Sequence, residues 1–251
     1  MNKKKFNGSF SCKKDIGKVR VTNEDETKVL INSAGNVLLM VADGMGGHNK
    51  GDYASKETIE IISQTFKDKK GFLSLFDAVS WLKKITKLAN NRIYKIQDED
   101  LMYKGMGTTL SLVLIYKNKL ISLSCGDSRT YWVKDGKLMQ ISEDQTYVNF
   151  LLKSGQITKE EALVHPERHV LTNAIGLFPS ISIDIKILKY NGETVFLCSD
   201  GLYNNVSEKD ILNILNTNLN TEEKVESLIN LGNFNGGSDN MSIALWESLD
   251  D

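Results

Sequence analysis

Four aspartates lie where an apolar segment of the sequence meets a turn of small residues. They are Asp43 in VADG, Asp127 in CGDS, Asp200 in CSDG and Asp239 in GSDN. Any one of them could simply begin a turn, because aspartate and glycine are common turn residues. Aspartate is depleted in strands, however, so four such residues at strand ends are poorly explained by turn formation alone. Carboxylates that converged at one sheet edge would repel one another, and bound cations would offset that repulsion.

The available donor atoms favour hard divalent cations over zinc. No histidine or cysteine pair accompanies the four aspartates at zinc-site spacing, and the three histidines form no recognisable pair on a helix. Carboxylate and carbonyl oxygens suit Mg²⁺, Mn²⁺ or Ca²⁺. The sequence has no EF-hand loop. Gly44 could lend a backbone carbonyl to the same ion, because it has no side chain to block access.

A basic residue and two acids near the N-terminus could complete such a site. Arg20 precedes Glu24 and Asp25 in the segment RVTNED. Alone, this segment would be interpreted as a solvated charged turn. Beside a cation site, the two acids would extend the ligand shell, and the planar guanidinium of Arg20 would bind a phosphate. The glycines after Asp43 form neither a P-loop nor a dinucleotide-binding fingerprint.

The composition is that of an ordinary globular protein. Of 251 residues, 41% are hydrophobic and 25% charged, with 31 Lys+Arg against 32 Asp+Glu. This balance argues against a nucleic-acid binder and a polybasic membrane anchor, and no apolar run is long enough for a transmembrane helix. The widely spaced Cys12, Cys125 and Cys198 argue against a disulfide framework and are expected to be small buried apolar residues. We expect a cytoplasmic protein with one domain over residues 1–251.

The elements that must position these residues are a mixture of strands and helices. We expect strands at residues 29–31, 37–41, 108–116, 119–125, 129–133, 137–141, 181–188, 194–198 and 241–246. We expect helices at residues 52–66, 76–96, 147–153, 159–164, 207–215 and 221–231. Ser207 and Thr221 are expected to cap the last two helices. Two-residue turns such as Asp135-Gly136 require antiparallel neighbours, so the pattern predicts an α+β protein.

Six segments together match one protein family in order. They are RVTNED at 20–25, VADGMGGH at 41–48, MGTTL at 106–110, CGDSR at 125–129, CSDGL at 198–202 and GSDNMS at 237–242. In these segments the chain resembles the PP2C (PPM) family of metal-dependent protein serine/threonine phosphatases, and closely its short bacterial single-domain members. The resemblance covers about residues 15–246. It implies an α+β fold in which two antiparallel β-sheets pack as a sandwich flanked by helix pairs, with metals at one end.

The resemblance implies a role for each acid in a pair of metal sites. Asp43 would bridge two Mn²⁺ or Mg²⁺ ions, Asp200 and Asp239 would complete the first site, and the Gly44 carbonyl would help to hold the second.

The remaining residues would act around that pair. Glu24 and Asp25 would belong to the shell of the second ion, partly through water, and Asp127 would join Asp200 in holding a weaker third ion. Arg20 would bind the substrate phosphate, so that the catalytic residues would be Arg20, Asp43 and Asp127. Residues 107–109 would be structural, at the start of a strand under the site.

Residues 142–176 resemble the mobile flap of the family, which includes the segment HPERHVLT at 165–172. The chain departs from the family pattern in two places. Residues 144–146 read Asp-Gln-Thr, where members often have Asp-His-Ser. Met45 occupies a position at which eukaryotic members carry a histidine proposed as general acid. Methionine cannot donate a proton, so a metal-bound or ordered water, or another residue such as His48, would have to protonate the leaving group.

These residues predict a phosphatase that hydrolyses phosphoserine and phosphothreonine monoesters with metal-activated water and no covalent intermediate. The alternative is a catalytically inactive PP2C fold that serves as a binding module, but no metal-binding aspartate is missing. A carbohydrate hydrolase would explain paired acids, yet it would not explain Arg20 or the glycine segment. The expected partners are phosphorylated proteins and a cognate Ser/Thr protein kinase, without nucleic acid or membrane, for a chain expected to be a monomer.

Overall fold

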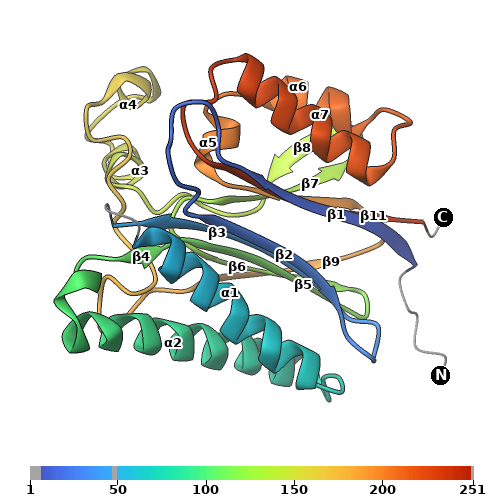
Figure 1. Cartoon of the computed structure of the whole chain (residues 1–251). Coiled ribbons are helices and arrows are strands. Elements are labelled where there is room, and N and C mark those ends of the chain that lie inside the picture. Colours follow the sequence, from blue (N-terminus) through green and yellow to red (C-terminus); the bar gives the residue numbers. More distant parts are fainter. Residues whose placement is uncertain (1–6, 47–49, 250–251) are drawn as a thin grey trace.

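Two antiparallel sheets pack face to face, and a pair of helices covers the outer face of each sheet (Figure 1). The computed structural model describes residues 7–46 and 50–249. The layered arrangement confirms the α+β sandwich predicted from the sequence.

The first sheet has five strands in the order β1-β11-β10-β7-β8. Their bounds are β1 Gly8–Asp15, β7 Arg129–Lys134, β8 Lys137–Gln140, β10 Thr194–Cys198 and β11 Met241–Ser248. Strand β1 was not predicted, because its sequence GSFSCKKD contains no β-branched residue. It forms because it pairs along its whole length with β11, from Gly8 opposite Ser248 to Asp15 opposite Met241.

The second sheet has the order β2-β3-β5-β6-β9, with β4 paired to β3. Its strands are β2 Asp25–Ile31, β3 Val37–Met45, β4 Gly107–Thr108, β5 Leu110–Tyr116, β6 Lys119–Cys125 and β9 Asp184–Lys189. Strand β9 begins three residues later than the predicted strand at 181–188. At Ser182 the side chain of Asn173, instead of a neighbouring strand, binds both the backbone N–H and the carbonyl.

The helices divide between the two faces. Helices α1 Gly51–Asp68 and α2 Leu75–Glu99 cover the second sheet, and α6 Glu208–Leu215 and α7 Thr221–Phe234 cover the first. Ser207 caps α6 as predicted, but the prediction that Thr221 caps α7 was wrong. Asn220 is the cap and forms a reciprocal capping box with Glu223, so Thr221 is already the first helical residue. None of the described helices is long and apolar enough to cross a membrane.

Three apolar layers hold these elements together. Phe66, Leu82 and Ile93 belong to the layer between the helix pair α1–α2 and the second sheet. The layer between the sheets includes the fully buried Trp246, and a third layer lies under α6 and α7. This packing fixes the relative positions of strand ends from both sheets.

The segment at residues 142–176 extends beyond the sandwich and contains the short helices α3 Tyr147–Lys153 and α4 Lys159–Val164, at the bounds expected from the sequence. Its start is tied down by an ion pair between Asp144 and Arg129, with 2.7 Å between Oδ2 and Nη2. Its end is tied to α2, because the Gly176 N–H donates to Asn90 Oδ1 at 2.8 Å. The single-turn helix α5 Asp200–Tyr203, which the sequence analysis missed, begins at one of the four aspartates.

Candidate active site

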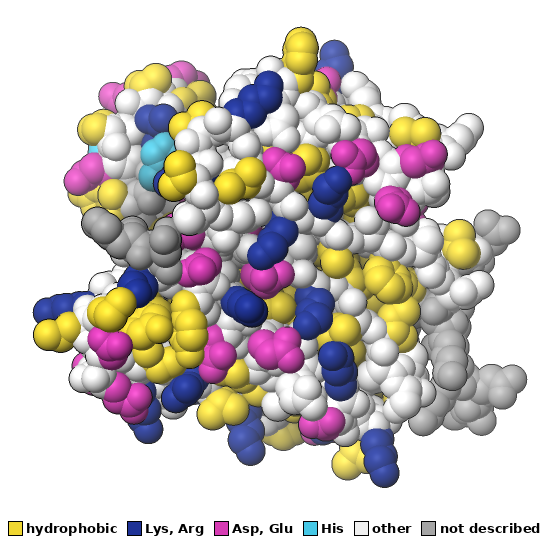
Figure 2. Space-filling model, in the orientation of Figure 1, with side chains coloured by type: hydrophobic (Ala, Val, Ile, Leu, Met, Phe, Trp, Pro, Cys, Tyr) yellow, Lys and Arg dark blue, Asp and Glu magenta, His cyan; other side chains and the backbone are white. Residues whose placement is uncertain are grey.

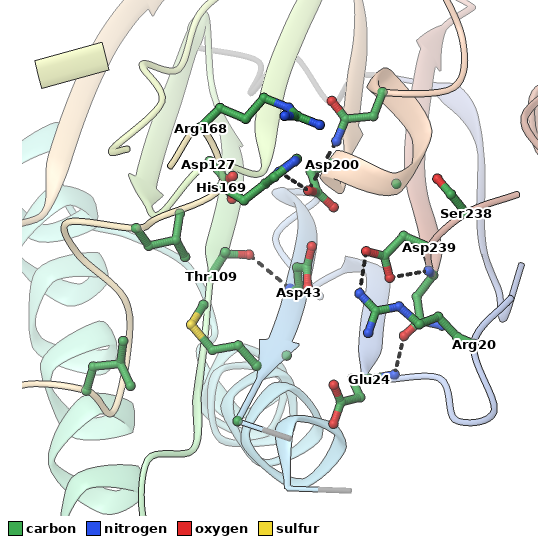
Figure 3. A pocket seen from close by; sticks show the side chains of 18 residues that line it. Arg20, Glu24, Asp43, Thr109, Asp127, Arg168, His169, Asp200, Ser238 and Asp239 are labelled. Atoms are coloured by element: carbon green, nitrogen blue, oxygen red, sulfur yellow. Dashed lines mark hydrogen bonds and ion pairs between the residues drawn. The ribbon is translucent and has the colours of Figure 1, made fainter. Parts of the chain in front are cut away.

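A cavity of about 930 Å³ opens at the end of the sandwich where strands of both sheets terminate. The second sheet contributes Asp43 on β3 and Asp127, which follows β6. The first sheet contributes Asp200, which follows β10, and Asp239, which precedes β11. Figure 3 shows the four carboxylates around one space, with Asp43 in a central position. The structure therefore brings together four acids that are widely separated in the sequence.

Asp43 is held in place through its backbone. Its carbonyl accepts hydrogen bonds from the Thr109 N–H at 2.8 Å and from Thr108 Oγ1 at 3.0 Å. Its own N–H donates to Thr109 Oγ1 at 2.9 Å. These contacts leave the carboxyl group directed at the cavity.

The approach of β3 to α1 requires a glycine at position 44. A Cβ atom on Gly44 would lie 2.2 Å from the carbonyl oxygen of Gly51, the first residue of α1. The Gly44 N–H donates to the Glu24 carbonyl at 3.1 Å, and the Glu24 side chain accepts from the Gly51 N–H at 3.2 Å. Glu24 is thus fixed between β3 and the start of α1, on the wall of the cavity.

Asp25 lies behind the cavity wall. It stands opposite Asp43 in the β2–β3 pair, is 1% exposed, and accepts a hydrogen bond from Ser199 Oγ at 2.5 Å. Burial raises its pKa to about 7, although hydrogen bonds from Ser199 and Ser242 act in the opposite direction. Of the predicted site residues, Asp25 is the one that does not line the cavity, so its position suits an indirect role.

Asp43 and Asp200 both line the cavity, and the charge of Asp200 affects the pKa of Asp43. Burial, followed by repulsion from Asp25 and Asp200, raises the pKa of Asp43 well above its ordinary value. Burial, followed by repulsion from Asp239, also raises the pKa of Asp200. A divalent cation bound between these carboxylates would offset this repulsion.

Asp127 forms the second acidic pair with Asp200. Gly126 turns the chain after β6 with φ at +100°, a conformation that favours glycine. The Tyr203 hydroxyl donates to the Asp127 carbonyl at 3.2 Å. Burial, followed by repulsion from Asp200 and Asp144, raises the pKa of Asp127 to about 8.

Arg20 supplies positive charge at the rim of the cavity. Its Nη2 donates to Asp239 Oδ2 at 2.7 Å, while its side chain remains 52% exposed. Asp239 is itself fixed by a 2.8 Å hydrogen bond from the Asn240 N–H. A guanidinium has five N–H donors, so this contact leaves others for an incoming anion.

The donor set of the cavity fits hard divalent cations. It consists of carboxylate and carbonyl oxygens where burial and mutual repulsion raise several pKa values. Within the described part of the chain, no three acidic, histidine or cysteine side chains meet closely enough to form a ready-made metal centre. The acids surround the cavity instead of meeting at one point, because like charges repel. Cations would draw them inward.

Three residues of the segment at 142–176 also line the cavity, and the sequence analysis did not include them in the site. They are Arg168, His169 and Leu171. His169 Nδ1 lies 3.9 Å from Asp200 Oδ2, and Figure 3 shows Arg168 and His169 on the side of Asp200 away from Arg20. The HPERHVLT segment contains all three residues and was the feature of the sequence that could have indicated them. Residue spacing alone, however, does not show that a loop contacts a cavity.

The identity of the group that protonates the leaving oxygen was left open by the sequence. Met45 lines the cavity but has no proton to donate. His48, considered above as an alternative acid, lies outside the described residues.

The three cysteines do not all match the expectation of buried apolar residues. Cys125 and Cys198 are buried, but Cys12 is exposed on β1, so the expectation for Cys12 was wrong. The side chains of β1 alternate between half-buried and exposed because β1 is an edge strand, and Cys12 falls on the exposed side.

Comparisons with known proteins agree with this geometry. The family model described as protein phosphatase 2C matches residues 18–234. The serine/threonine phosphatase Stp of Listeria monocytogenes is 34% identical over 234 residues, which cover 93% of each chain.

Solved structures show the same arrangement. The serine/threonine phosphatase of S. agalactiae superposes with a TM-score of 0.91 at 34% identity, covering 96% of this chain and 100% of that one. The catalytic domain of the phosphatase PstP, in complex with two manganese ions, superposes with a TM-score of 0.85 at 31% identity, covering 97% of this chain and 99% of that one.

We expect the free energy of unfolding, measured in EDTA, to fall as the pH rises from about 6 to about 8. The pKa values of Asp25 and Asp127 are raised to about 7 and about 8, whereas an unfolded aspartate has a pKa of about 3.9. The folded chain therefore binds more protons than the unfolded chain in this pH range. The free-energy cost of ionising the two aspartates in the folded chain is absent below the unfolded pKa and complete above the folded pKa. Urea unfolding across this pH range measures the slope.

The matched control is Asp127→Asn, which removes one of the titrating groups and should give a shallower slope. A free energy of unfolding that rises with pH in the wild-type protein, or an unchanged slope in the variant, would contradict the assignment of buried, mutually repelling acids.

Proposed function

The chain belongs to the protein phosphatase 2C family and is a protein serine/threonine phosphatase, and we propose that the acids of its cavity hold the divalent cations of this reaction. The observation that carries the proposal is the convergence of Asp43, Asp200 and Asp239 with Arg20 in one cavity. The PstP relative that contains two manganese ions supports dependence on divalent metal.

In the proposed site, Asp43 would bridge two Mn²⁺ or Mg²⁺ ions. Asp200 and Asp239 would complete the first, and the Gly44 carbonyl would help to hold the second. Glu24 and Asp25 would belong to the shell of the second ion, partly through water, in keeping with the position of Asp25 behind the wall. Two cations bound in this way would lower the pKa of a shared water to near neutrality and offset the negative charge of the phosphate.

The chain's own residues orient the substrate. Arg20 binds the phosphate oxygens through the N–H groups that Asp239 leaves free, and Asp239 keeps the guanidinium at the rim. Positioning and charge neutralisation account for most of the catalysis of phosphoryl transfer, so an oriented guanidinium is a substantial contribution.

The cysteines support a mechanism without a covalent phosphoenzyme. Burial raises the pKa of Cys125 to about 12, and it raises that of Cys198 as well. A thiol with a raised pKa is protonated at neutral pH and is a poor nucleophile. Neither residue lines the cavity.

Asp127 is proposed to join Asp200 in holding a weaker third cation. Both side chains line the cavity, and repulsion from Asp200 contributes to the raised pKa of Asp127. An ion held there would lie beside the substrate, where it could assist the leaving oxygen in the absence of a proton donor at Met45.

Residues 142–176 are proposed to form a mobile flap of this single domain that recognises protein substrates. The segment places Arg168 and His169 at the cavity, and its helices expose Phe150 and Leu163 to solvent. Exposed apolar side chains on this segment suit contact with the residues that flank a phosphorylated side chain in a protein.

Phosphorylated proteins are the proposed partners, and a cognate Ser/Thr kinase would supply them. The face shown in Figure 2 mixes Lys and Arg side chains with Asp and Glu, which is typical of a protein that does not bind nucleic acid. The proposal includes a cytoplasmic location and a monomeric state. The free thiols of Cys12, Cys125 and Cys198 are in keeping with a reducing compartment.

Asp43→Asn should lose the paired cations and nearly all turnover of a phosphothreonine peptide in Mn²⁺, because a neutral amide bridges two cations poorly. The matched control is Asp135→Asn, in an exposed turn with φ at +50° that asparagine tolerates. Turnover within about tenfold of the wild type at saturating Mn²⁺ would contradict the assignment.

Arg20→Ala should weaken substrate use while it leaves Mn²⁺ affinity nearly unchanged, because Arg20 contacts the phosphate and not the metal. Steady-state kinetics should show a higher KM, a lower kcat or both, and calorimetry should show normal Mn²⁺ binding. Arg92→Ala, which removes an exposed ion pair with Glu57, is the control. The assignment fails if the main effect of Arg20→Ala is lost Mn²⁺ binding.

Asp127→Ala should keep the fold and the two core cations but reduce phosphopeptide turnover well over tenfold. A residue that only formed the turn would instead cost about 1 kcal/mol of stability and leave catalysis intact. A crystal structure in Mn²⁺ with no ion near Asp127, together with normal kinetics of the variant, would rule out the third cation.

A further inference from the structure

The backbone ladder between β3 and its neighbour is interrupted at Asp43. In this register Asp43 faces Thr109, which lies between β4 and β5. The Thr109 N–H donates to the Asp43 carbonyl at 2.8 Å, as in a regular antiparallel pair. The return bond is different, because the Asp43 N–H donates to the Thr109 side-chain hydroxyl at 2.9 Å and not to the Thr109 carbonyl.

The Thr109 carbonyl is occupied by another hydroxyl. Thr108 Oγ1 lies 3.0 Å from it and also 3.0 Å from the Asp43 carbonyl. The conformation of the backbone at Asp43 therefore depends on threonine hydroxyls as well as on the one regular ladder bond from the Thr109 N–H. The hydrogen bond from the Asp43 N–H to the Thr109 hydroxyl is drawn as a dashed line in Figure 3.

The Thr109 hydroxyl is in turn fixed by Ser128, which lies in the turn just before β7 of the first sheet. Its Oγ1 lies 2.6 Å from Ser128 Oγ, and either hydroxyl can be the donor. Thr109 is 1% exposed and Ser128 is 2% exposed, so water does not readily replace this contact. Ser128 adjoins Asp127 in the sequence, and the pair thus connects the segments that carry two acids of the cavity.

A second hydroxyl pair lies two residues further along the same strands. Ser111 Oγ and Thr130 Oγ1 are 2.9 Å apart and fully buried. This pair also joins the two sheets, but neither hydroxyl contacts Asp43. The Ser111–Thr130 pair is therefore a control for the Thr109–Ser128 pair, because it has the same chemistry and burial but lies away from the acids.

We propose that Thr109, held by Ser128, is a positioning residue that sets the orientation of Asp43 and hence the affinity of the cation pair. The inference rests on the proposed role of Asp43 as the bridging ligand. Replacing the hydroxyl with a methyl group removes the acceptor of the Asp43 N–H, so the strand is free to return to the regular ladder and turn the carboxylate. Metal ligands must be held to within a fraction of an ångström, and outer contacts that do so typically affect affinity 10- to 100-fold.

The test compares Thr109→Val with Thr130→Val in the full chain, by calorimetric titration with Mn²⁺ alone. Both variants lose one buried hydroxyl and should lower the melting temperature to a similar degree. Thr109→Val should weaken Mn²⁺ binding by about 10-fold or more, and Thr130→Val should remain within about twofold of the wild type. With p-nitrophenyl phosphate, Thr109→Val should need more Mn²⁺ for half-maximal activity, with KM for the substrate unchanged at saturating Mn²⁺.

Thr109→Ser keeps the hydroxyl and should restore wild-type Mn²⁺ affinity. If Thr109→Val does not fold, Ser128→Ala takes its place, because it leaves Thr109 Oγ1 without its anchor and should weaken Mn²⁺ binding at least about threefold. Unchanged affinity in whichever of these two variants is measured, or equal losses in Thr109→Val and Thr130→Val, would overturn the inference.

Asp43→Asn separates this inference from the function on which it rests. If Asp43→Asn loses Mn²⁺ binding and Thr109→Val retains it, the positioning role alone is wrong. If Asp43→Asn retains Mn²⁺ binding, the assignment of Asp43 is wrong, and the positioning role is overturned with it.

Discussion

Repulsion among buried carboxyl groups is the constraint on which the rest of the site depends. Asp127 is buried and Asp43 and Asp200 are partly buried at the end of the sandwich, and burial and repulsion from neighbouring acids raise the pKa of each. Such an arrangement opposes folding unless the surrounding structure holds the acids together. The fold does so with rigid elements from both sheets, and the positive charge that offsets the repulsion comes from Arg20 and, in the proposed function, from cations.

The interior of the sandwich changes from apolar to polar toward the end that carries the cavity. Between the sheets the central layer is apolar and includes Leu39, Val113 and Trp246. Close to the acids, hydroxyl groups replace alkyl groups, as in the Ser199 contact with Asp25 and the Thr109 contact with Ser128. Hydroxyls in these places supply directed hydrogen bonds that an apolar core cannot supply, and they fix the backbone and side chains of the acids. The structure thus gives up some apolar burial to hold charged groups in place, as functional sites commonly do.

Many of the strands, turns and site residues were predictable because they are marked by local features of the sequence. The four aspartates stood out by their position at the ends of apolar strands. The hairpin at Asp135-Gly136 was marked by its turn residues, and Asp135 adopts a positive φ as such a turn requires. Strand β1 was missed because its pairing with β11 is long-range and its own residues have low strand propensity. Thr221 was taken as a helix cap because threonine is a common cap, but Asn220 could form the capping box with Glu223.

The site itself was predicted as a set of residues but not as a geometry. The sequence could not show that Asp25 lies behind the wall or that His169 reaches Asp200, because both depend on contacts across the fold.

The most direct measurement of cation binding at Asp43 is a crystal structure in Mn²⁺ with anomalous scattering recorded at the manganese edge. We expect two strong peaks that share the Asp43 carboxylate, with Asp200 and Asp239 on one of them. Peaks that lie away from Asp43, or a cavity without manganese at saturating concentration, would contradict this expectation.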